Sequence, residues 1–366
     1  MSRNLLIVLG LCTVVAVLLA LGLVDRAGES SPESDGELLL PGLENQVNEI
    51  EALEIVGPDG GTVASLHRDR ERWRLREKHD YEADFARIHE LLRDLSQAHR
   101  LEAKTDNPEW YGRLGVDAVE SDGERGMTVR FPEAELPGVI IGKPDPAGIG
   151  RYVRLEGESR AWLVGQDIDL PRERMEWLER AIMDIPPSDI AAVTIRHPGG
   201  DTVELRPGDE EGGTWVMLDP PAGREVKPAW ALGQTANVLA RLNMEDVRPH
   251  QSAAVPSDAV EAIFTTRDGL VFKATTFEDE GGKWLRFRVA GADESSGSDE
   301  TPSESAQGVS ETSDLTDREL DVVAIDGRLS PWQFAVSDDR FESLRVGTED
   351  LLEEPEQAPE ATDSGG

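Results

Sequence analysis

Cysteine is almost absent from this chain of 366 residues. The single cysteine, Cys12, lies inside an apolar run near the N-terminus, so the polar remainder of the chain has no thiol. That remainder cannot form a disulfide and offers no cysteine nucleophile, which excludes thiol chemistry. Its fold must therefore be stabilised by a hydrophobic core alone.

Basic residues are scarce relative to acidic ones. The chain has 37 Lys and Arg against 73 Asp and Glu, which gives a formal net charge of -36. Such a surface repels nucleic-acid phosphates and an anionic lipid leaflet, so the composition predicts no nucleic-acid partner. Because the acidic residues are spread along the whole chain, we interpret the composition as that of a protein from a salt- or alkali-loving bacterium.

The common catalytic and metal-binding patterns are missing as well. No two of the six histidines are three or four residues apart, so none can pair on one helical turn to bind zinc. No GxSxG nucleophile elbow occurs. The segment Gly138-Val-Ile-Ile-Gly142-Lys143 resembles a phosphate loop, but only three residues separate its glycines and Pro144 replaces the magnesium-binding Ser or Thr. We predict a strand and a turn there, and the sequence indicates no catalytic residue, no cofactor and no metal ligand.

Two groups of residues leave alternatives open. Asp167 and Asp169 flank Ile168 just after a predicted strand, and strand alternation directs both carboxylates to one face. They could bind calcium or act as acid and base, but acids are so abundant that a solvated surface is favoured. Aromatic residues, 5% of the chain, could line a groove for a glycan or peptide, although core filling is favoured. The candidates are the eight tryptophans and one tyrosine: Trp73, Trp110, Tyr111, Trp162, Trp177, Trp215, Trp230, Trp284 and Trp332.

The chain does contain one long apolar run, from Leu5 to Val24, without a charge. A helix rises about 1.5 Å per residue, so this run matches a hydrocarbon core of roughly 30 Å. Arg3 precedes the run and acidic residues follow it, so the N-terminus should lie in the cytoplasm and the body outside. We predict that residues 1–25 are a single-pass anchor in the inner membrane. The alternative is a cleaved signal peptide, whose apolar region is usually shorter, about 7–15 residues.

The polar part of the chain begins with a Ser-, Pro- and acid-rich segment, which predicts a flexible linker over residues 26–46. Residues 47–188 then show short β-like segments, such as Ala52–Val56, separated by turn signals. Between Ala83 and Leu101 the apolar residues recur at three- and four-residue spacing, which predicts a helix. A second helix is predicted over Arg172–Met183.

The same pattern then recurs with an offset of about 140–147 residues, typical of a duplicated domain. Ile50 corresponds to Ile190, Trp73 to Trp215 and Leu92 to Leu239. We predict two tandem α+β domains of antiparallel sheet with packed helices. They occupy residues 47–188 and 189–348, with a disordered acidic insertion at 291–319 and a disordered acidic tail at 349–366.

The order of these elements resembles the bacterial family called domain of unknown function 4340. The resemblance rests on a single N-terminal span, Arg72-Trp73-Arg74-Leu75, Asn107-Pro-Glu-Trp-Tyr-Gly-Arg-Leu-Gly115 and Arg151-Tyr-Val-Arg154. It implies a setting similar to that of auxiliary components of ABC-type exporters, including those linked to gliding motility. We therefore expect a membrane-anchored extracytoplasmic accessory or scaffold protein without catalysis, partnered with an ABC-type transporter. The alternative is an envelope enzyme or a glycan- or peptide-binding protein with an aromatic or acidic cleft.

Overall fold

The computed structural model describes residues 36–118, 125–208, 214–250, 256–279, 282–291 and 321–354. The predicted anchor 1–25 and, apart from Gly291, the predicted insertion 291–319 lie outside the described residues. Within the described part of the chain, no helix is both long and apolar enough to cross a membrane.

Contacts along the backbone divide the chain into two units. The first unit comprises residues 1–71 and 85–172, and the second comprises 72–84 and 173–366. The change at 172 therefore comes earlier than the predicted change between 188 and 189. Within the second unit, the backbone N–H of Asp84 donates to the carbonyl of the fully buried Trp177 at 2.9 Å, which explains why residues 72–84 group with this later segment.

The first sheet is antiparallel, with the strand order β4-β3-β2-β1-β6-β7-β8-β9-β5. Its strands are β1 Ala52–Val56, β2 Thr62–Asp69, β3 Arg72–Leu75, β4 Tyr81–Glu82, β5 Arg100–Ala103, β6 Met127–Arg130, β7 Val139–Pro144, β8 Arg151–Leu155 and β9 Ala161–Val164. The short runs rich in Val, Ile and Leu fit a pleated, half-buried surface, and turn residues separate them. Ile55, Ala64, Val129 and Val153 are each 0% exposed and form part of its core.

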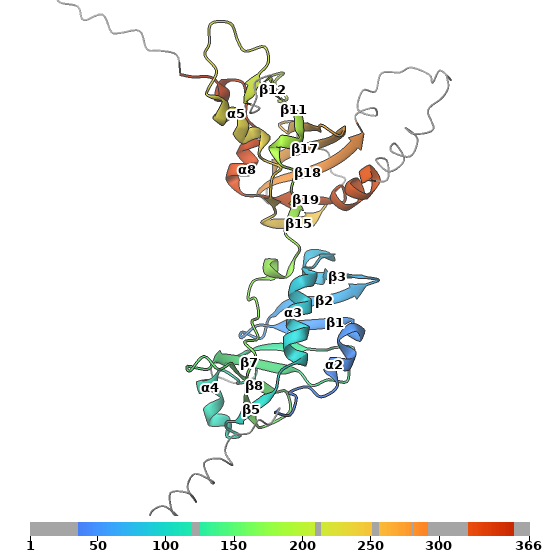
Figure 1. The fold of residues 1–366 in the computed structure, drawn as a ribbon, viewed down its shortest axis with the longest axis vertical. Helices are drawn as coiled ribbons and strands as arrows, with labels where there is room; N and C mark the ends of the chain where they lie inside the picture. The colour runs from blue at the N-terminus through green and yellow to red at the C-terminus, as the bar shows by residue number, and fades with distance from the viewer. Residues whose placement is uncertain are drawn as a thin grey trace, which may run out of the picture. The chain divides into compact units, whose positions relative to one another are not determined.

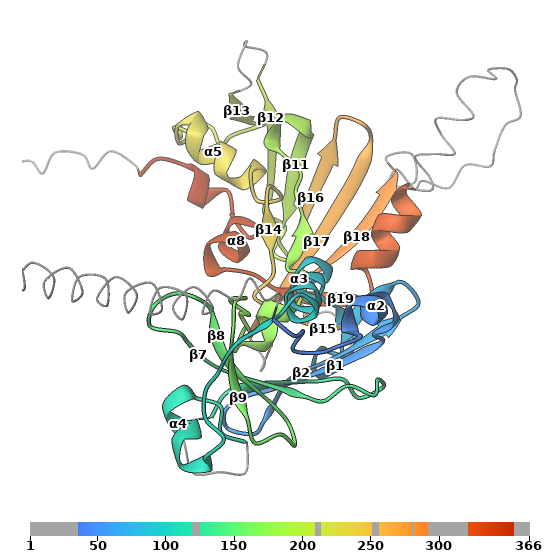
Figure 2. The ribbon, with the colours of Figure 1, turned by 60° about the horizontal axis from the view of Figure 1, so that its bottom comes forward.

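The second sheet is also antiparallel, with the order β13-β12-β11-β16-β17-β18-β19-β15 (Figures 1 and 2). Its strands are β11 Ile190–Arg196, β12 Thr202–Pro207, β13 Trp215–Met217, β15 Asp246–Pro249, β16 Val260–Thr266, β17 Leu270–Asp279, β18 Gly282–Gly291 and β19 Trp332–Ala335. Along β16 buried and half-buried residues alternate without interruption, which is the period expected of a strand with one face on the core. A small two-stranded sheet pairs β10 Ala181–Met183 with β14 Leu242–Asn243.

Among the residues that the structure describes, helices are few and short. In the first unit α3, Phe85–Ser96, buries Ile88, Leu91, Leu92 and Leu95 and lies across β1 and β2 (Figure 1). The remaining α-helices are α2 Leu43–Gln46, α4 Tyr111–Leu114, α5 Ala229–Ala236 and α8 Asp338–Ser343, and residues 321–329 are also helical. The 3₁₀ turns are η1 Val47–Glu49, η2 Arg76–Lys78, η3 Pro108–Trp110, η4 Arg174–Trp177, η5 Pro187–Asp189 and η6 Glu349–Leu351. The prediction of an α+β fold built mainly from antiparallel sheets is confirmed.

The two sheets repeat one strand order. From β3 to β5 the first sheet reads β3-β2-β1-β6-β7-β8-β9-β5, and the second reads β13-β12-β11-β16-β17-β18-β19-β15. Each strand of the first series has a counterpart in the second with the same neighbours. Trp73 on β3 and Trp215 on β13 occupy matching strands, as the sequence offset predicted. Leu92 lies within α3, whereas Leu239 follows the end of α5, so that pair of the predicted correspondence lies in unlike local structure.

Two segments predicted to be flexible contain ordered, buried residues. In the predicted linker 26–46, Leu39, Leu40 and Leu43 are at most 1% exposed, and Leu39 N–H donates to the Ala98 carbonyl at 2.7 Å. In the predicted tail 349–366, η6 buries Leu351, and Leu352 forms a β-bridge with Val226. Both predictions were therefore wrong for these residues. The prediction failed because short apolar stretches lie among Ser, Pro and acidic residues. Burial of a few leucines is enough to keep such a segment ordered.

The helix predicted over Arg172–Met183 is also wrong. The segment forms the turn η4 and then the short strand β10, and Leu178 between them is extended and bridges Ala83. Met175, Leu178 and Ile182 have helical spacing, but three positions are too few to establish a period. Backbone partners in other segments, such as Asn243 opposite Ala181, hold the chain in the extended form instead.

Candidate functional site

The two candidate carboxylates, Asp167 and Asp169, follow β9 and flank the buried Ile168, as strand alternation predicted. Asp167 accepts hydrogen bonds from Arg151 Nε at 3.1 Å and from Arg151 Nη2 at 2.9 Å. Asp169 instead lines a cavity in the first unit. The structure thus places Asp167 in an ion pair and Asp169 beside a cavity.

The second unit contains an equivalent ion pair. Lys283, near the start of β18, contacts Asp338 at 3.1 Å, and Asp338 follows β19 at the same interval at which Asp167 follows β9. Glu342 on α8 adds a second carboxylate to Lys283 at 2.7 Å. Because the pair recurs at matching places in the two sheets, it favours a structural role for Asp167 over acid–base chemistry.

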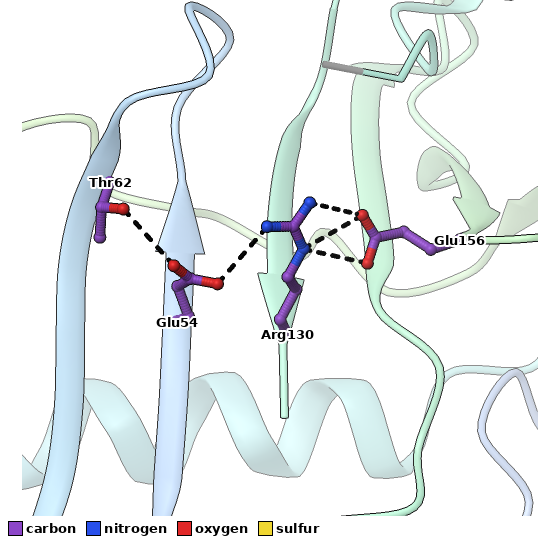
Figure 3. Close-up of polar contacts among 4 residues, drawn as sticks. All are labelled: Glu54, Thr62, Arg130 and Glu156. Atoms are coloured by element: carbon purple, nitrogen blue, oxygen red, sulfur yellow. Dashed lines mark hydrogen bonds and ion pairs between the residues drawn. The ribbon is translucent and has the colours of Figure 1, made fainter. Parts of the chain in front are cut away.

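Gly138, the first residue of the segment that resembles a phosphate loop, makes room for a polar network across β7. Arg130 on β6 reaches past β7 to Glu156, which follows β8, with 2.9 Å between Arg130 Nη2 and Glu156 Oε1. A Cβ atom on Gly138 would overlap the carboxylate of Glu156. Arg130 also contacts Glu54 on β1 at 3.4 Å, and Glu54 accepts a hydrogen bond from Thr62 on β2 (Figure 3).

This network stabilises the charged form of Arg130. The hydrogen bonds that Arg130 donates to Glu156, together with the one it donates to Glu54, raise the pKa of Arg130 above its ordinary value. The side chains are about one third exposed, so each ion pair contributes modestly to stability. We interpret the network as a polar tie that spans the five neighbouring strands β2, β1, β6, β7 and β8.

The cavity beside Asp169 is basic, which is unusual in so acidic a chain. It has a volume of about 360 Å³ and lies within the first unit. Among the described residues that line it, four are cationic, Arg125, Lys143, Arg151 and Arg172, and one, Asp169, carries a carboxylate. We call this site the basic cavity. Its chemistry suits an anionic group, because guanidinium and ammonium groups donate charge-assisted hydrogen bonds to oxyanions.

The shape of the basic cavity depends on an irregularity in β7. The pairing of β7 with β8 shifts register between Ile141 and Pro144, so Gly142 and Lys143 form a β-bulge. A Cβ atom on Gly142 would overlap the carbonyl oxygen of Leu114, so the chain passes this close only because residue 142 is glycine. The bulge thus places the Lys143 side chain in the wall of the basic cavity.

Buried aromatic residues mostly fill the core, as predicted. Trp73, Trp177, Trp215 and Trp284 are at most 7% exposed. Two of the predicted core residues are surface residues instead: Trp110 is 49% exposed and stacks on Arg113, and Trp230 is 70% exposed. The exposed pair keeps the alternative of an aromatic binding surface open.

Trp230 lies at an open hollow in the second unit, between β13 and α5. The hollow has a volume of about 520 Å³ and is mainly apolar, with Trp215 and Trp230 beside the amides of Gln234 and Asn237. We call it the aromatic hollow. An aromatic ring next to amide donors and acceptors can stack on a sugar or a peptide side chain and hydrogen-bond its polar groups.

Asp201, at the turn between β11 and β12, has a clearly shifted acidity. The hydroxyl of Thr348 donates to it at 2.6 Å and the Thr348 backbone N–H at 2.9 Å, and these bonds lower the pKa of Asp201. The contact ties the C-terminal segment to this turn. Within the described residues, no group of three or more His, Cys, Asp or Glu side chains is arranged to hold a metal ion.

The basic residues of the cavity could not be predicted from the sequence. The spacing of Gly138 and Gly142 does not fit a phosphate loop, and Arg125 and Arg172 belong to no recognisable motif. Arg125, Lys143, Arg151 and Arg172 come from four separate segments, and no local pattern reports that such segments converge.

Two antiparallel sheets of matching strand order, with short covering helices, define the class of protein as a two-sheet α+β protein. A family profile described as Domain of unknown function (DUF4340) matches residues 73–262. The match covers more than half of the chain, so the chain belongs to this family. No curated protein and no solved structure matches the chain.

Proposed function

We propose that this chain is an extracytoplasmic accessory protein, held at the inner membrane by residues 5–24, that works by binding an ABC-type transporter without catalysis. The two parts of the body, 47–188 and 189–348, are in this proposal copies of one duplicated domain. The matching strand order and the matching ion pairs Arg151–Asp167 and Lys283–Asp338 support the duplication. The setting comes from the family resemblance and from the apolar run.

The observation that carries the binding role is the pair of edge strands with exposed apolar side chains. β5 ends the first sheet and β13 ends the second. Leu101 on β5 is 49% exposed and Val216 on β13 is 42% exposed. An edge strand offers backbone hydrogen-bonding groups that a partner strand can use, and exposed apolar side chains favour that contact.

The experiment that tests this role is co-purification of the full chain from detergent-solubilised membranes, followed by identification of the captured proteins. We expect subunits of an ABC-type transporter with the wild-type chain. The double variant Leu101→Lys and Val216→Lys should lose them, because a lysine on an edge strand opposes pairing. Ile149→Lys is the matched control, since Ile149 is 55% exposed but lies in a turn. Equal capture by all three chains would contradict an edge-strand contact, and absence of transporter subunits would contradict the partner.

The placement of the body is tested separately. Protease added to spheroplasts should degrade the body and leave cytoplasmic control proteins intact, because the charge around residues 5–24 places the N-terminus inside. An intact, fully protected chain would contradict this orientation. A chain that begins after residue 24 in purified membranes would indicate a cleaved signal peptide.

The second candidate function is glycan or peptide binding through the aromatic hollow. The exposed Trp230 beside the amides of Gln234 and Asn237 favours it. Tryptophan fluorescence titration with cell-wall oligosaccharides and peptides tests it. Saturable quenching that Trp230→Ala removes, and that Trp110→Ala leaves unchanged, would favour this function over the accessory role.

A further inference from the structure

The basic cavity stands out because its charge has the opposite sign to that of the chain. Of the lining residues that the structure describes, Arg125, Lys143, Arg151 and Arg172 are cationic and Asp169 is the one carboxylate, whereas the whole chain carries a net charge of -36. Four cationic side chains around one space attract an anion. Asp167 forms an ion pair with Arg151.

The wall of this cavity is built rather than incidental. Arg151 is held in place on one side by Asp167, at 2.9 and 3.1 Å, and its Nη1 donates to the Gly142 carbonyl at 3.4 Å. Its side chain is only 19% exposed, so its position is well defined. Arg125 Nη1 donates to the Pro58 carbonyl at 3.4 Å, which anchors a second guanidinium. Fixed guanidinium groups bind oxyanions well because little side-chain entropy is lost on binding.

Access to the cavity is open on one side. Lys143, Asp169 and Arg172 are exposed residues, while Arg125 and Arg151 are half-buried deeper in the wall. The volume of about 360 Å³ lies at the small end of the range for small-molecule sites. It can hold one compact solute and excludes a folded macromolecular partner.

We propose that the basic cavity is a binding site for a small solute that carries a phosphate or carboxylate group. The oxyanion binds between the fixed guanidinium groups of Arg125 and Arg151, and the exposed cations of Lys143 and Arg172 close over it. Asp169 faces the same space and weakens the binding of an anion. This site lies on the first unit and goes beyond the accessory role, since it requires no transporter.

Equilibrium dialysis of the full chain in detergent, with inorganic phosphate and with succinate as separate probes, tests the proposal. Ionic strength is held constant with NaCl, because every salt relieves the self-repulsion of so acidic a chain. We expect one saturable site per chain for at least one probe. The stronger probe then distinguishes a phosphate site from a carboxylate site.

Two variants of opposite effect decide the outcome. Lys143→Gln with Arg172→Gln should weaken binding about tenfold or more, because each charge-assisted hydrogen bond contributes on the order of a factor of ten. Asp169→Asn should tighten binding several-fold, an effect that misfolding cannot imitate. Arg93→Gln on α3 is the control, since Arg93 is exposed and paired with Asp94 elsewhere in the first unit. No saturable binding of either probe, or affinities unchanged by both cavity variants, would overturn the proposal.

Discussion

The two sheets of this protein share a strand order but differ in how β7 pairs with β8 and how their counterparts β17 and β18 pair. In the first sheet β7 and β8 pair through a shifted register, with the bulge at Gly142 and Lys143. In the second sheet the counterparts β17 and β18 pair continuously, from Leu270 opposite Gly291 to Asp279 opposite Gly282. The basic cavity lies at the bulge, whereas the regular hairpin borders a smaller cavity of about 280 Å³ through Thr275 on β17 and Arg286 on β18.

The segments that follow β9 and β19 also differ between the two units. After β19, Asp338 begins α8, and this helix brings Glu342 to Lys283 as a second carboxylate. After β9, the chain continues without an α-helix, and Asp169 borders the basic cavity. The comparison teaches that one sheet topology keeps its ion pair in both units, while the basic cavity lies where the first sheet departs from regular pairing.

The largest effect should come from the matched core residues Ile55 on β1 and Ile195 on β11, both 0% exposed. Replacing either with alanine should lower the free energy of unfolding by about 2–5 kcal/mol, because it removes buried methyl groups and leaves a cavity. Urea unfolding combined with hydrogen exchange measures the loss and its location. If the units are alike, each variant loses protection mainly in its own sheet, and Val216→Ala at an exposed position serves as the control.

A glycine substitution should separate the irregular sheet from the regular one. Gly142→Ala should destabilise the first unit by about 1–3 kcal/mol, because the added methyl overlaps the Leu114 carbonyl. Gly199→Ala, in the turn between β11 and β12, meets no atom within 4 Å and should change stability by no more than about 0.5 kcal/mol. Thermal unfolding of the two variants checks the difference, and equal midpoints would show that the bulge is not under this constraint.

The Asp201 contact predicts a pH effect confined to the second unit. The pKa of Asp201 is lowered in the folded state, so its contribution is present above the unfolded pKa and is lost as pH falls through the folded pKa. Asp201→Asn should reduce stability at pH 7 by less than about 1 kcal/mol, since the group is exposed and screened. The difference from wild type should shrink as pH falls below about 4, where both states of wild type become protonated.

Urea unfolding at pH 7 and at pH 3 measures this effect as a difference between variant and wild type. The control is Asp59→Asn in the matching turn of the first unit, where Asp59 only accepts from the nearby Gly61 N–H at 3.0 Å. A stability difference for Asp201→Asn that stays constant with pH would contradict the assignment of the shift to Thr348.

The smallest effect should come from the matched ion pairs. Asp167→Asn and Asp338→Asn remove carboxylates that are 75% and 82% exposed, and each should cost less than about 1 kcal/mol. The Asp338 variant should cost less, because Glu342 remains on Lys283. Thermal midpoints in low salt measure the pair, and a larger loss for Asp338→Asn would show that the two ion pairs are not equivalent.

Much of the fold could be predicted from the sequence because strands and α3 carry regular apolar periods. The strands Ala52–Val56, Arg151–Leu155 and Ala161–Val164 lie where the pattern placed them. Trp73 and Trp215, which the offset matched, lie on corresponding strands of the two sheets. The errors fall where a few leucines anchor a polar segment, as at Leu39 and Leu351, or where a short apolar period meets a strand partner.

The candidate site could be predicted only in part. The alternation around Ile168 placed Asp167 and Asp169 on the exposed side, and Lys143 stood out beside a glycine. The ion-pair partner of Asp167 and the other cationic residues that line the cavity with Lys143 could not be predicted. Arg151 lies on the neighbouring strand β8, while Arg125 and Arg172 come from distant segments, and only the register of the sheet joins them.

The sequence by itself determined the composition-dependent properties of this protein: its extreme acidity, the absence of thiol chemistry from its body, its α+β class and its family. These follow from residue types and local periods, which need no knowledge of distant contacts. The tertiary structure alone decided that β7 bulges at Gly142, that Gly138 leaves space for Arg130 to reach Glu156, and that cations from four segments gather around one cavity. Such arrangements depend on strand register and on the close approach of backbones, and neither is encoded in any single stretch of the chain.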